Sequence, residues 1–240
     1  MLGRIGLPGV QAGRAGVSQP VLLGLAGVAK FLGERLVFKN LDLEVGAGEV
    51  LMVVGVNGAG KTTLLRIMAG LARPSAGQVT SLVERRDMAF VGHQTFLYHE
   101  ATALENLRFW TSLQGPGLTD SVLEQALSRV GLARFAQEQA GHFSRGMAQR
   151  LNLARVLCLA PKLLFLDEPD TGLDQRSRAM LADEIVQAPG TGRAVVWVSH
   201  HLERDMPLAN RVLHLHKGRA AYLGPAKDFD ASALAGEPAC

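Results

Sequence analysis

The stretch GVNGAGKTT, residues 55–63, decides the fold, because it satisfies the phosphate-binding pattern G-x-x-x-x-G-K-[ST] at every fixed position. An apolar run at residues 50–54 precedes it and predicts a buried strand, and residues 64–71 have helical character. A strand, a glycine-rich loop and a helix in this order form the context that the pattern requires. The sequence therefore predicts a nucleotide site at this loop, and a turn that merely caps a helix is the alternative.

The residue types in the loop fit the chemistry of a bound phosphate chain. Glycines let the backbone curve around the anion, so that successive N–H groups and the positive end of the next helix face it. We expect Lys61 to reach the β- and γ-phosphates and the Thr62 hydroxyl to take a Mg²⁺ coordination position. The loop residues predicted to contact the nucleotide are Gly55, Val56, Asn57, Gly58, Ala59, Gly60, Lys61, Thr62 and Thr63.

Composition indicates a packed globular protein. The chain has 240 residues and is 48% hydrophobic, which is enough for one large α/β domain or two small ones. It carries 25 Lys and Arg against 22 Asp and Glu, so its net charge of +3 reflects a mixed surface and does not imply a nucleic-acid partner. Cys158 and Cys240 lie far apart and predict neither a disulfide framework nor a zinc site. The cytoplasm is the expected compartment.

No apolar run reaches the roughly 18 residues that a membrane-spanning helix needs. We therefore expect any membrane association to run through a partner. Arg4 and Arg14 precede a short apolar segment, residues 21–29, that loosely resembles a secretory signal. We interpret this segment instead as the first strand of the fold. Residues 1–20 are rich in glycine and lack a pattern, which predicts a loose N-terminal tail.

Several short apolar runs predict strands on either side of the phosphate loop. Residues 21–28 and 36–45 predict two strands of an antiparallel sheet edge, joined by a turn at residues 31–34. Short strands are also predicted at residues 78–83 and 88–91. These segments surround the loop with β-structure.

A helical insert is predicted over about residues 95–160. Residues 101–113 and 120–136 carry apolar side chains at helical spacing, and a further helix is expected to end at Leu159, before Pro161. The insert would interrupt the α/β core. Its apolar positions include Leu104, Leu107 and Trp110 in the first segment and Val122, Leu127 and Val130 in the second.

Polar side chains stand at the ends of two further buried strands. Residues 162–166 deliver Asp167 and Glu168 at the carboxyl end of a strand, where α/β sheets place their ligands. Residues 194–199 form another apolar strand that ends at His200. Successive strand-end residues point in different directions, so the two carboxylates can serve different groups. Helix capping or a salt bridge is the alternative use of these carboxylates.

The C-terminal part completes one domain. Residues 211–216 and 219–223 predict a final hairpin. The predicted organisation is a single domain over residues 21–224, and residues 225–240 are expected to form a C-terminal tail without assigned structure.

Five elements in a fixed order make this sequence resemble the ATP-binding cassette (ABC) ATPase family, the motor subunits of transporters. They are the loop at residues 55–63, Gln94, residues 144–146, the strand that ends at Glu168, and His200. The resemblance covers residues 21–224. It implies an α/β fold, namely a P-loop NTPase cassette with a RecA-like core, an antiparallel β edge and a helical subdomain insert.

The resemblance also implies roles for single residues, with ATP as the nucleotide and Mg²⁺ as the metal. Asp167 would hold Mg²⁺ through its water shell, together with Thr62. Glu168 would be the general base that orients the attacking water, and His200 would contact the γ-phosphate. Gln94 would touch both Mg²⁺ and the attacking water, although a plain strand-end amide is the alternative for this residue.

A short segment matches the family signature L-S-G-G-Q only in part. Ser144 and Gly146 match its serine and second glycine, whereas Phe143, Arg145 and Met147 depart from it. The matching hydroxyl and helix N-terminus would bind the γ-phosphate held by a second protomer. The departures concern the geometry of that contact more than its chemistry.

Because the signature acts across an interface, the resemblance implies two cassettes face to face, as a homodimer. Asp174 resembles the residue of the loop that crosses this interface. The expected partners are separately encoded transmembrane permease subunits. They would hold the chain on the cytoplasmic face of the inner membrane as a peripheral subunit.

Cassettes of this kind often place an aromatic ring under adenine shortly before the phosphate loop. Phe31 is the candidate here, and Leu32 is the alternative if the register shifts by one residue. An aromatic ring that only packs in the turn is equally compatible with the sequence.

The layout also resembles the ATP-binding subunits of haem exporters used in cytochrome c maturation. The carriers of this resemblance are ERLVF at residues 34–38, GHQ at 92–94 and TALENL at 102–107. It implies an ATPase that powers haem export without binding haem itself. Cassettes of drug, lipid or polysaccharide exporters share much of the pattern. A nucleotide-binding scaffold without turnover is a further alternative, and a cassette of DNA repair or translation lacks its usual second cassette, coiled coil or zinc cysteines here.

Overall fold

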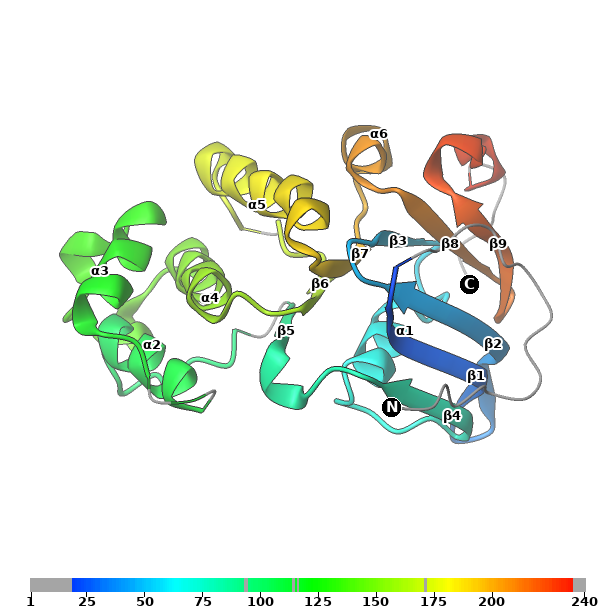
Figure 1. The fold of residues 1–240 in the computed structure, drawn as a ribbon, viewed down its shortest axis with the longest axis horizontal. Coiled ribbons are helices and arrows are strands. Elements are labelled where there is room, and N and C mark those ends of the chain that lie inside the picture. Colours follow the sequence, from blue (N-terminus) through cyan, green and yellow to red (C-terminus); the bar gives the residue numbers. More distant parts are fainter. Residues whose placement is uncertain (1–18, 93–94, 114, 116, 171, 235–240) are drawn as a thin grey trace, which may run out of the picture.

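The computed structural model describes residues 19–92, 95–113, 115, 117–170 and 172–234. Two β-sheets and their covering helices form one side of the molecule, and a group of helices extends from the other side (Figure 1). This arrangement agrees with the α/β architecture and helical insert that the sequence predicts.

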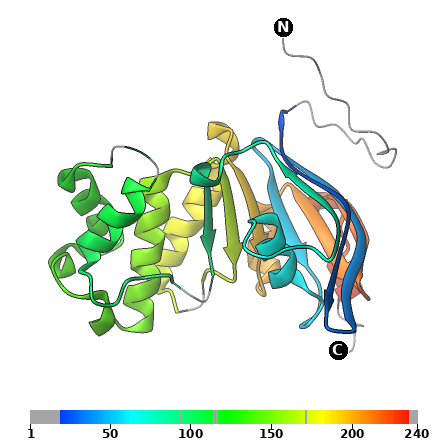
Figure 2. The ribbon, with the colours of Figure 1, turned by 90° about the horizontal axis from the view of Figure 1, so that it is seen from below.

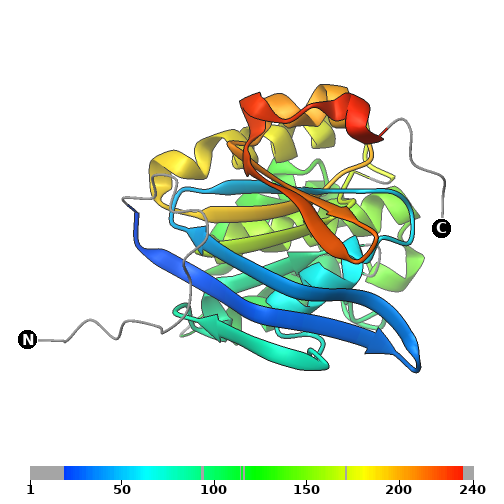
Figure 3. The ribbon, with the colours of Figure 1, turned by 90° about the vertical axis from the view of Figure 1, so that its right-hand side faces the viewer.

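The smaller sheet is antiparallel and has the strand order β2-β1-β4. Its strands are β1 (Val21–Leu32), β2 (Arg35–Gly46) and β4 (Ala76–Ser81). Strand β1 extends four residues beyond the predicted end, because Leu32 pairs with Arg35 and the turn shrinks to Gly33 and Glu34. Figure 3 shows these strands in front, with a hairpin beside β2.

The larger sheet has the order β5-β6-β7-β3-β8-β9 and is parallel except for β9, which pairs antiparallel with β8. All residues of its three central strands are buried, as expected for parallel strands covered on both faces. The six strands are β3 (Val50–Val54), β5 (Met88–Val91), β6 (Leu163–Asp167), β7 (Ala194–Val198), β8 (Arg211–His216) and β9 (Arg219–Pro225).

Alternate residues of the central strands feed two separate cores. Val50 and Met52 of β3 join one core, whereas Leu51 and Val53 join the other. The second core encloses helix α1 (Lys61–Met68), whose apolar residues pack with both sheets. Figure 2 shows this helix between the two sheets, immediately after the end of β3. The fold therefore fixes the start of α1 at the carboxyl edge of the larger sheet.

The first core is covered by helices that include the predicted insert. Helices α2 (Ala103–Ser112), α3 (Asp120–Arg129) and α4 (Arg145–Leu159) form the group at the far left of Figure 1. Helix α5 (Gln175–Gln187) and the short α6 (Leu202–Asp205) lie closer to the sheet. Short 3₁₀ turns also lie between elements of the fold, at Arg85–Asp87, Ala133–Phe135, Ala140–His142, Pro189–Thr191 and Met206–Leu208.

Two details of the insert differ from the sequence prediction. Leu127 and Val130 are buried as predicted, but Val122 is 42% exposed and Leu123 takes the buried position. Helix α3 also ends at Arg129 rather than near residue 136, because Gly131 adopts a φ of +70° that breaks the helical path. The apolar spacing alone fits either neighbouring register, and packing against α2 and α4 selects one.

The chain after β9 packs on the larger sheet, where the sequence assigned no structure. Two 3₁₀ turns, Ala226–Asp228 and Ala231–Leu234, follow the strand. The ring of Phe229 lies 5.2 Å from that of Tyr222 and 5.7 Å from that of His214, measured between centroids. In the described part of the chain, no helix has the length and apolar character that crossing a membrane requires.

Candidate active site

The predicted phosphate loop connects β3 to α1, which confirms the strand, loop and helix context. Gly60 precedes the helix with a φ of +97°, and a Cβ added there would lie 2.6 Å from Val37 Cγ1. Gly55 has a φ of +146°, and a Cβ there would lie 2.4 Å from the carbonyl oxygen of Leu215. Glycine is therefore required at both positions by backbone conformation and by space.

Lys61 opens helix α1 and is only 7% exposed. Its Nζ donates hydrogen bonds to the carbonyl oxygens of Gly55 (2.7 Å) and Val56 (3.0 Å). Burial lowers the pKa of the Lys61 amine, and the negative charges of Glu168 and Asp167 oppose that shift. The ammonium group is thus held inside the curve of the loop, where an anionic phosphate chain would meet it.

Asp167 and Thr62 bring two oxygen atoms together at the carboxyl edge of the sheet. Asp167 ends β6, is 2% exposed, and accepts a hydrogen bond from Thr62 Oγ1 on its Oδ1 at 2.9 Å. Oxygen atoms of this kind are the ligands that Mg²⁺ prefers. The described residues contain no group of three or more His, Cys, Asp or Glu side chains suited to a metal. The pair fits Mg²⁺ only as a partial ligand set, completed by phosphate and water oxygens, which is the usual arrangement beside a nucleotide.

Glu168 and His200 meet above the tips of two adjacent strands. Glu168 has a φ of +52°, which is uncommon for a residue other than glycine, and its N–H donates to Val198 O at 3.0 Å. Its Oε1 lies 2.5 Å from Nε2 of His200, which follows β7. The two adjacent carboxylates thus contact different partners, Asp167 contacting Thr62 and Glu168 contacting His200. Backbone strain of this kind concentrates at functional sites.

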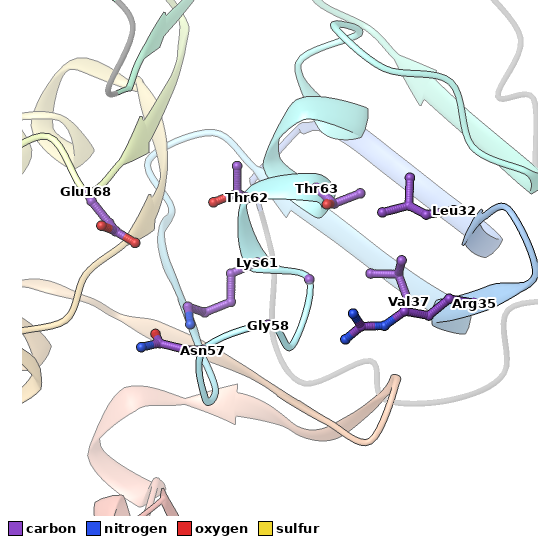
Figure 4. Close-up of a pocket in the computed structure, with 10 residues that line it drawn as sticks. Leu32, Arg35, Val37, Asn57, Gly58, Lys61, Thr62, Thr63 and Glu168 are labelled. Atoms are coloured by element: carbon purple, nitrogen blue, oxygen red, sulfur yellow. The ribbon is translucent and has the colours of Figure 1, made fainter. Parts of the chain in front are cut away.

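A pocket of about 310 Å³ opens over the loop. Its volume lies in the range of small-molecule sites, about 300–1,000 Å³. Figure 4 shows Glu168 and Asn57 on one side of it and Leu32, Val37 and Arg35 on the other. Its lining residues are Leu32, Arg35, Val37, Asn57, Gly58, Gly60, Lys61, Thr62, Thr63 and Glu168.

Of the two side chains predicted as candidates for the adenine contact, one lines the pocket and one does not. Leu32, the alternative in the sequence, lines the pocket, whereas Phe31 is not among its lining residues and is 44% exposed. Sequence reasoning missed Arg35 and Val37. Both belong to β2 and reach the loop only because the antiparallel sheet folds over α1, a long-range contact for which the sequence carried no signal.

The predicted signature residues lie outside this pocket. Ser144 caps helix α4 and accepts a hydrogen bond on Oγ from Met147 N–H at 3.3 Å. Gly146 is in close contact with a neighbouring turn, because a Cβ added there would lie 2.8 Å from Gly172 O. Asp174 caps α5 through a 2.8 Å hydrogen bond from Ser177 N–H, which lowers the pKa of its carboxyl. Gln94 lies outside the described residues, so its role stays a prediction.

Comparison with known proteins gives a consistent family assignment. Residues 38–171 match the family model for ABC transporters. The chain is 39% identical over 194 residues to the cytochrome c biogenesis ATP-binding export protein CcmA of Pseudomonas syringae pv. tomato. The aligned residues cover 78% of this chain and 91% of that protein. It is 33% identical over 198 residues to the ABC transporter ATP-binding protein NatA of Bacillus subtilis, with 78% and 80% of the two chains covered.

A solved structure supports the same assignment. It is an ATP-binding cassette determined as a dimer in a post-hydrolysis state with ADP and phosphate bound. It superimposes with a TM-score of 0.76 at 26% identity, and covers 87% of this chain and all of the solved chain. With the phosphate loop, the strand-end carboxylates and these similarities together, the chain belongs to the ABC transporter family as an ATP-binding subunit whose ATP hydrolysis is coupled to transport.

Proposed function

We propose that this chain powers a haem exporter of the kind used in cytochrome c maturation. The observation that carries the proposal is the 39% identity with a protein named as a cytochrome c biogenesis ATP-binding export protein, over 91% of that protein's length. The similarity to NatA, named as an ABC transporter ATP-binding protein, supports a different ABC transporter as the second candidate. The cassette itself is not proposed to bind haem.

The site geometry supports specific roles in ATP hydrolysis. Glu168 acts as the general base that orients the attacking water, and the 2.5 Å contact with His200 holds its carboxylate at the tips of β6 and β7. His200 also contacts the γ-phosphate, and Lys61 with the loop N–H groups binds the phosphate chain. Three residues carry the proposed metal role: Asp167 and Thr62, which are in contact in the structure, and Gln94, which is expected from the sequence alone.

Mg²⁺ bound by these residues would neutralise charge on the β- and γ-phosphate oxygens. The side chains at the far side of the pocket receive the base and ribose. Leu32 and Val37 offer aliphatic surface there, and the guanidinium of Arg35 offers a planar cation. In this arrangement Leu32 takes the place expected for Phe31.

The proposed working form is a dimer. Ser144, Gly146 and Asp174 do not line the chain's own pocket, which supports their use across an interface with a second cassette. We propose a homodimer held on separately encoded permease subunits at the cytoplasmic face of the inner membrane. The related cassette solved as a dimer with ADP and phosphate supports this assembly.

The decisive experiment deletes the gene in its native host and measures covalent haem in c-type cytochromes by haem staining. The full chain should restore the stain, and Glu168→Gln should not, because it lacks the carboxylate that activates water. Glu124→Gln, an exposed residue of α3, is the matched control and should restore it fully.

ATP hydrolysis and ATP binding are also measured on the same variants as purified proteins. These measurements test the role of Glu168 in hydrolysis independently of the transported substrate. Glu168→Gln should lower turnover at least about 100-fold while ATP still binds, as expected for loss of a general base. Normal c-type cytochromes in the deletion strain would exclude the haem exporter and favour another ABC exporter. Unchanged turnover in Glu168→Gln would exclude the assigned base.

A further inference from the structure

Arg204, on the short helix α6, bridges two loops that carry the residues proposed for hydrolysis. Its Nη2 donates to Asp170 Oδ2 at 2.8 Å and to Asp205 Oδ2 at 2.8 Å, and its Nε donates to Asp205 Oδ1 at 2.5 Å. Asp170 lies two residues after Glu168. One guanidinium group therefore connects the loop after β6 with the helix after β7.

Asp205 continues the connection to the residues that flank His200. Its Oδ2 accepts a hydrogen bond from the hydroxyl of Ser199, the residue directly before His200. The Ser199 hydroxyl in turn accepts the N–H of His201 at 3.0 Å. Ser199 and Asp205 are 3% and 2% exposed. Both chain neighbours of His200 thus take part in hydrogen bonds with Ser199 and Asp205, whose side chains are buried.

The loop after β6 is held from a second direction as well. Gln149 on α4 is 5% exposed, and its Nε2 donates to Pro169 O at 3.0 Å. Asp170, the next residue, is also 3.4 Å from Nε2 of His201. The segment that follows Glu168 is therefore fixed between α4 and α6.

We propose that Arg204, through Asp170 and Asp205, is a positioning residue that locks the Glu168 loop against the His200 loop. The two loops come from different strands, and Nε2 of His200 contacts Oε1 of Glu168 across them. An arginine fork that binds both aspartates sets the spacing of the loops and so the spacing of these side chains. The inference rests on the roles proposed above for Glu168 and His200.

The chemistry of the bridge requires arginine. A guanidinium group presents several N–H donors in one plane and binds two carboxylates at fixed angles, whereas a lysine amine is a compact point charge. The Asp205 side chain is 3% exposed and that of Asp170 is 11% exposed, so each carboxylate depends on its partners. The hydrogen bond with Asp205 raises the pKa of Arg204, which agrees with a cation held firmly between two anions.

The test measures kcat and KM for ATP hydrolysis by the full-length chain. Arg204→Gln should lower kcat about 10-fold, because small displacements of catalytic groups are costly, and should leave KM within about twofold. The Arg204→Lys variant keeps the charge and should still fall below wild-type kcat. Arg108→Gln is the matched control: Arg108 also forms a forked pair, with Asp120, and its side chain is 49% exposed against 45% for Arg204.

A double-variant cycle identifies the bridge as the cause. Asp170→Asn should lower kcat as well, and adding it to Arg204→Gln should cost no more than about a further twofold, because both variants disrupt the same Arg204–Asp170 contact between the loops. Additive losses, wild-type kcat in Arg204→Gln or Arg204→Lys, or a matching rise in KM would overturn the proposal. Glu168→Gln measured in parallel separates the hypotheses: if it keeps wild-type turnover, the proposed base is wrong, whatever Arg204 does.

Discussion

At the scale of single residues, the site depends on backbone positions that only particular residues tolerate. Gly55 and Gly60 adopt positive φ values in contact with the sheet, and Glu168 adopts a φ of +52° despite its side chain. The glycine positions could be predicted from the phosphate-binding pattern. The strained conformation of Glu168 could not, because it arises where β6 meets β7 and nothing in the local sequence marks it.

Gly60→Ala tests this constraint directly. The added Cβ would lie 2.6 Å from Val37 Cγ1 and 3.1 Å from the Phe38 ring, at a φ of +97°. We expect a loss of about 1–3 kcal/mol in the free energy of unfolding, typical of strained backbone, together with weaker ATP binding. Urea denaturation measures the first effect and equilibrium titration the second.

Gly190→Ala is the control for that substitution. Gly190 lies in the 3₁₀ turn Pro189–Thr191, and an added Cβ there would have nothing within 4 Å. It should unfold at nearly the wild-type urea concentration and bind ATP normally. Equal stability of the Gly60 and Gly190 variants would show that the contact with Val37 relaxes without cost.

At the scale of elements, local patterns predicted the type of each element better than its contacts. The central strands were predictable because short apolar runs, four or five residues long, suit a buried parallel sheet. The length of β1 could not be predicted, because its pairing with β2 decides it. The register of α3 could not be predicted either, because packing against α4 decides it. Two further contacts could not be predicted for the same reason, because the residues that make them lie far apart in the sequence. They are the contact of Arg35 and Val37 with the phosphate-loop pocket and the contact of Arg204 with Asp170.

Arg155 shows how one buried side chain joins three elements of the fold. It lies on α4, is 5% exposed, donates from Nη2 to Phe90 O on β5 at 2.7 Å, and its guanidinium carbon lies 4.8 Å from the Trp110 ring centroid on α2. Burial lowers its pKa to about 10, so the residue remains charged at neutral pH. The helical subdomain is thereby attached to the edge of the larger sheet, just before the segment that contains Gln94.

Replacing Arg155 with methionine should loosen this attachment. The variant loses a charged hydrogen bond and a cation–π contact, partly offset by removal of a buried charge, so we expect about 1–3 kcal/mol of destabilisation. Thermal unfolding measures the effect, and Arg178→Met, at an exposed position of α5, should leave the melting temperature unchanged. Equal melting temperatures for both variants would mean that desolvation of Arg155 cancels its contacts.

At the scale of the whole molecule, the proposed dimer would build each site from two parts of different chains. Lys61 and Glu168 line the pocket over the phosphate loop, whereas Ser144 is the N-cap of α4, which belongs to the helical group of Figure 1. If the two parts belong to different protomers, ATP should join the chains, and hydrolysis should release them. The Glu168→Gln variant should then accumulate as a dimer in ATP and Mg²⁺, measured by analytical ultracentrifugation, and return to a monomer in ADP.

Ser144→Asp tests whether the start of α4 faces the partner's triphosphate. Aspartate caps a helix as well as serine does, so the fold should be retained, but its negative charge would repel the γ-phosphate across the interface. Introduced into Glu168→Gln, it should weaken ATP-dependent dimerisation at least about 10-fold while ATP binding to the monomer persists. The matched control is Thr119→Asp, the same kind of change at the N-cap of α3, which should dimerise normally. Undiminished dimerisation of Ser144→Asp would place the γ-phosphate away from α4, and dimers that form equally without nucleotide would mean that ATP does not join the two parts.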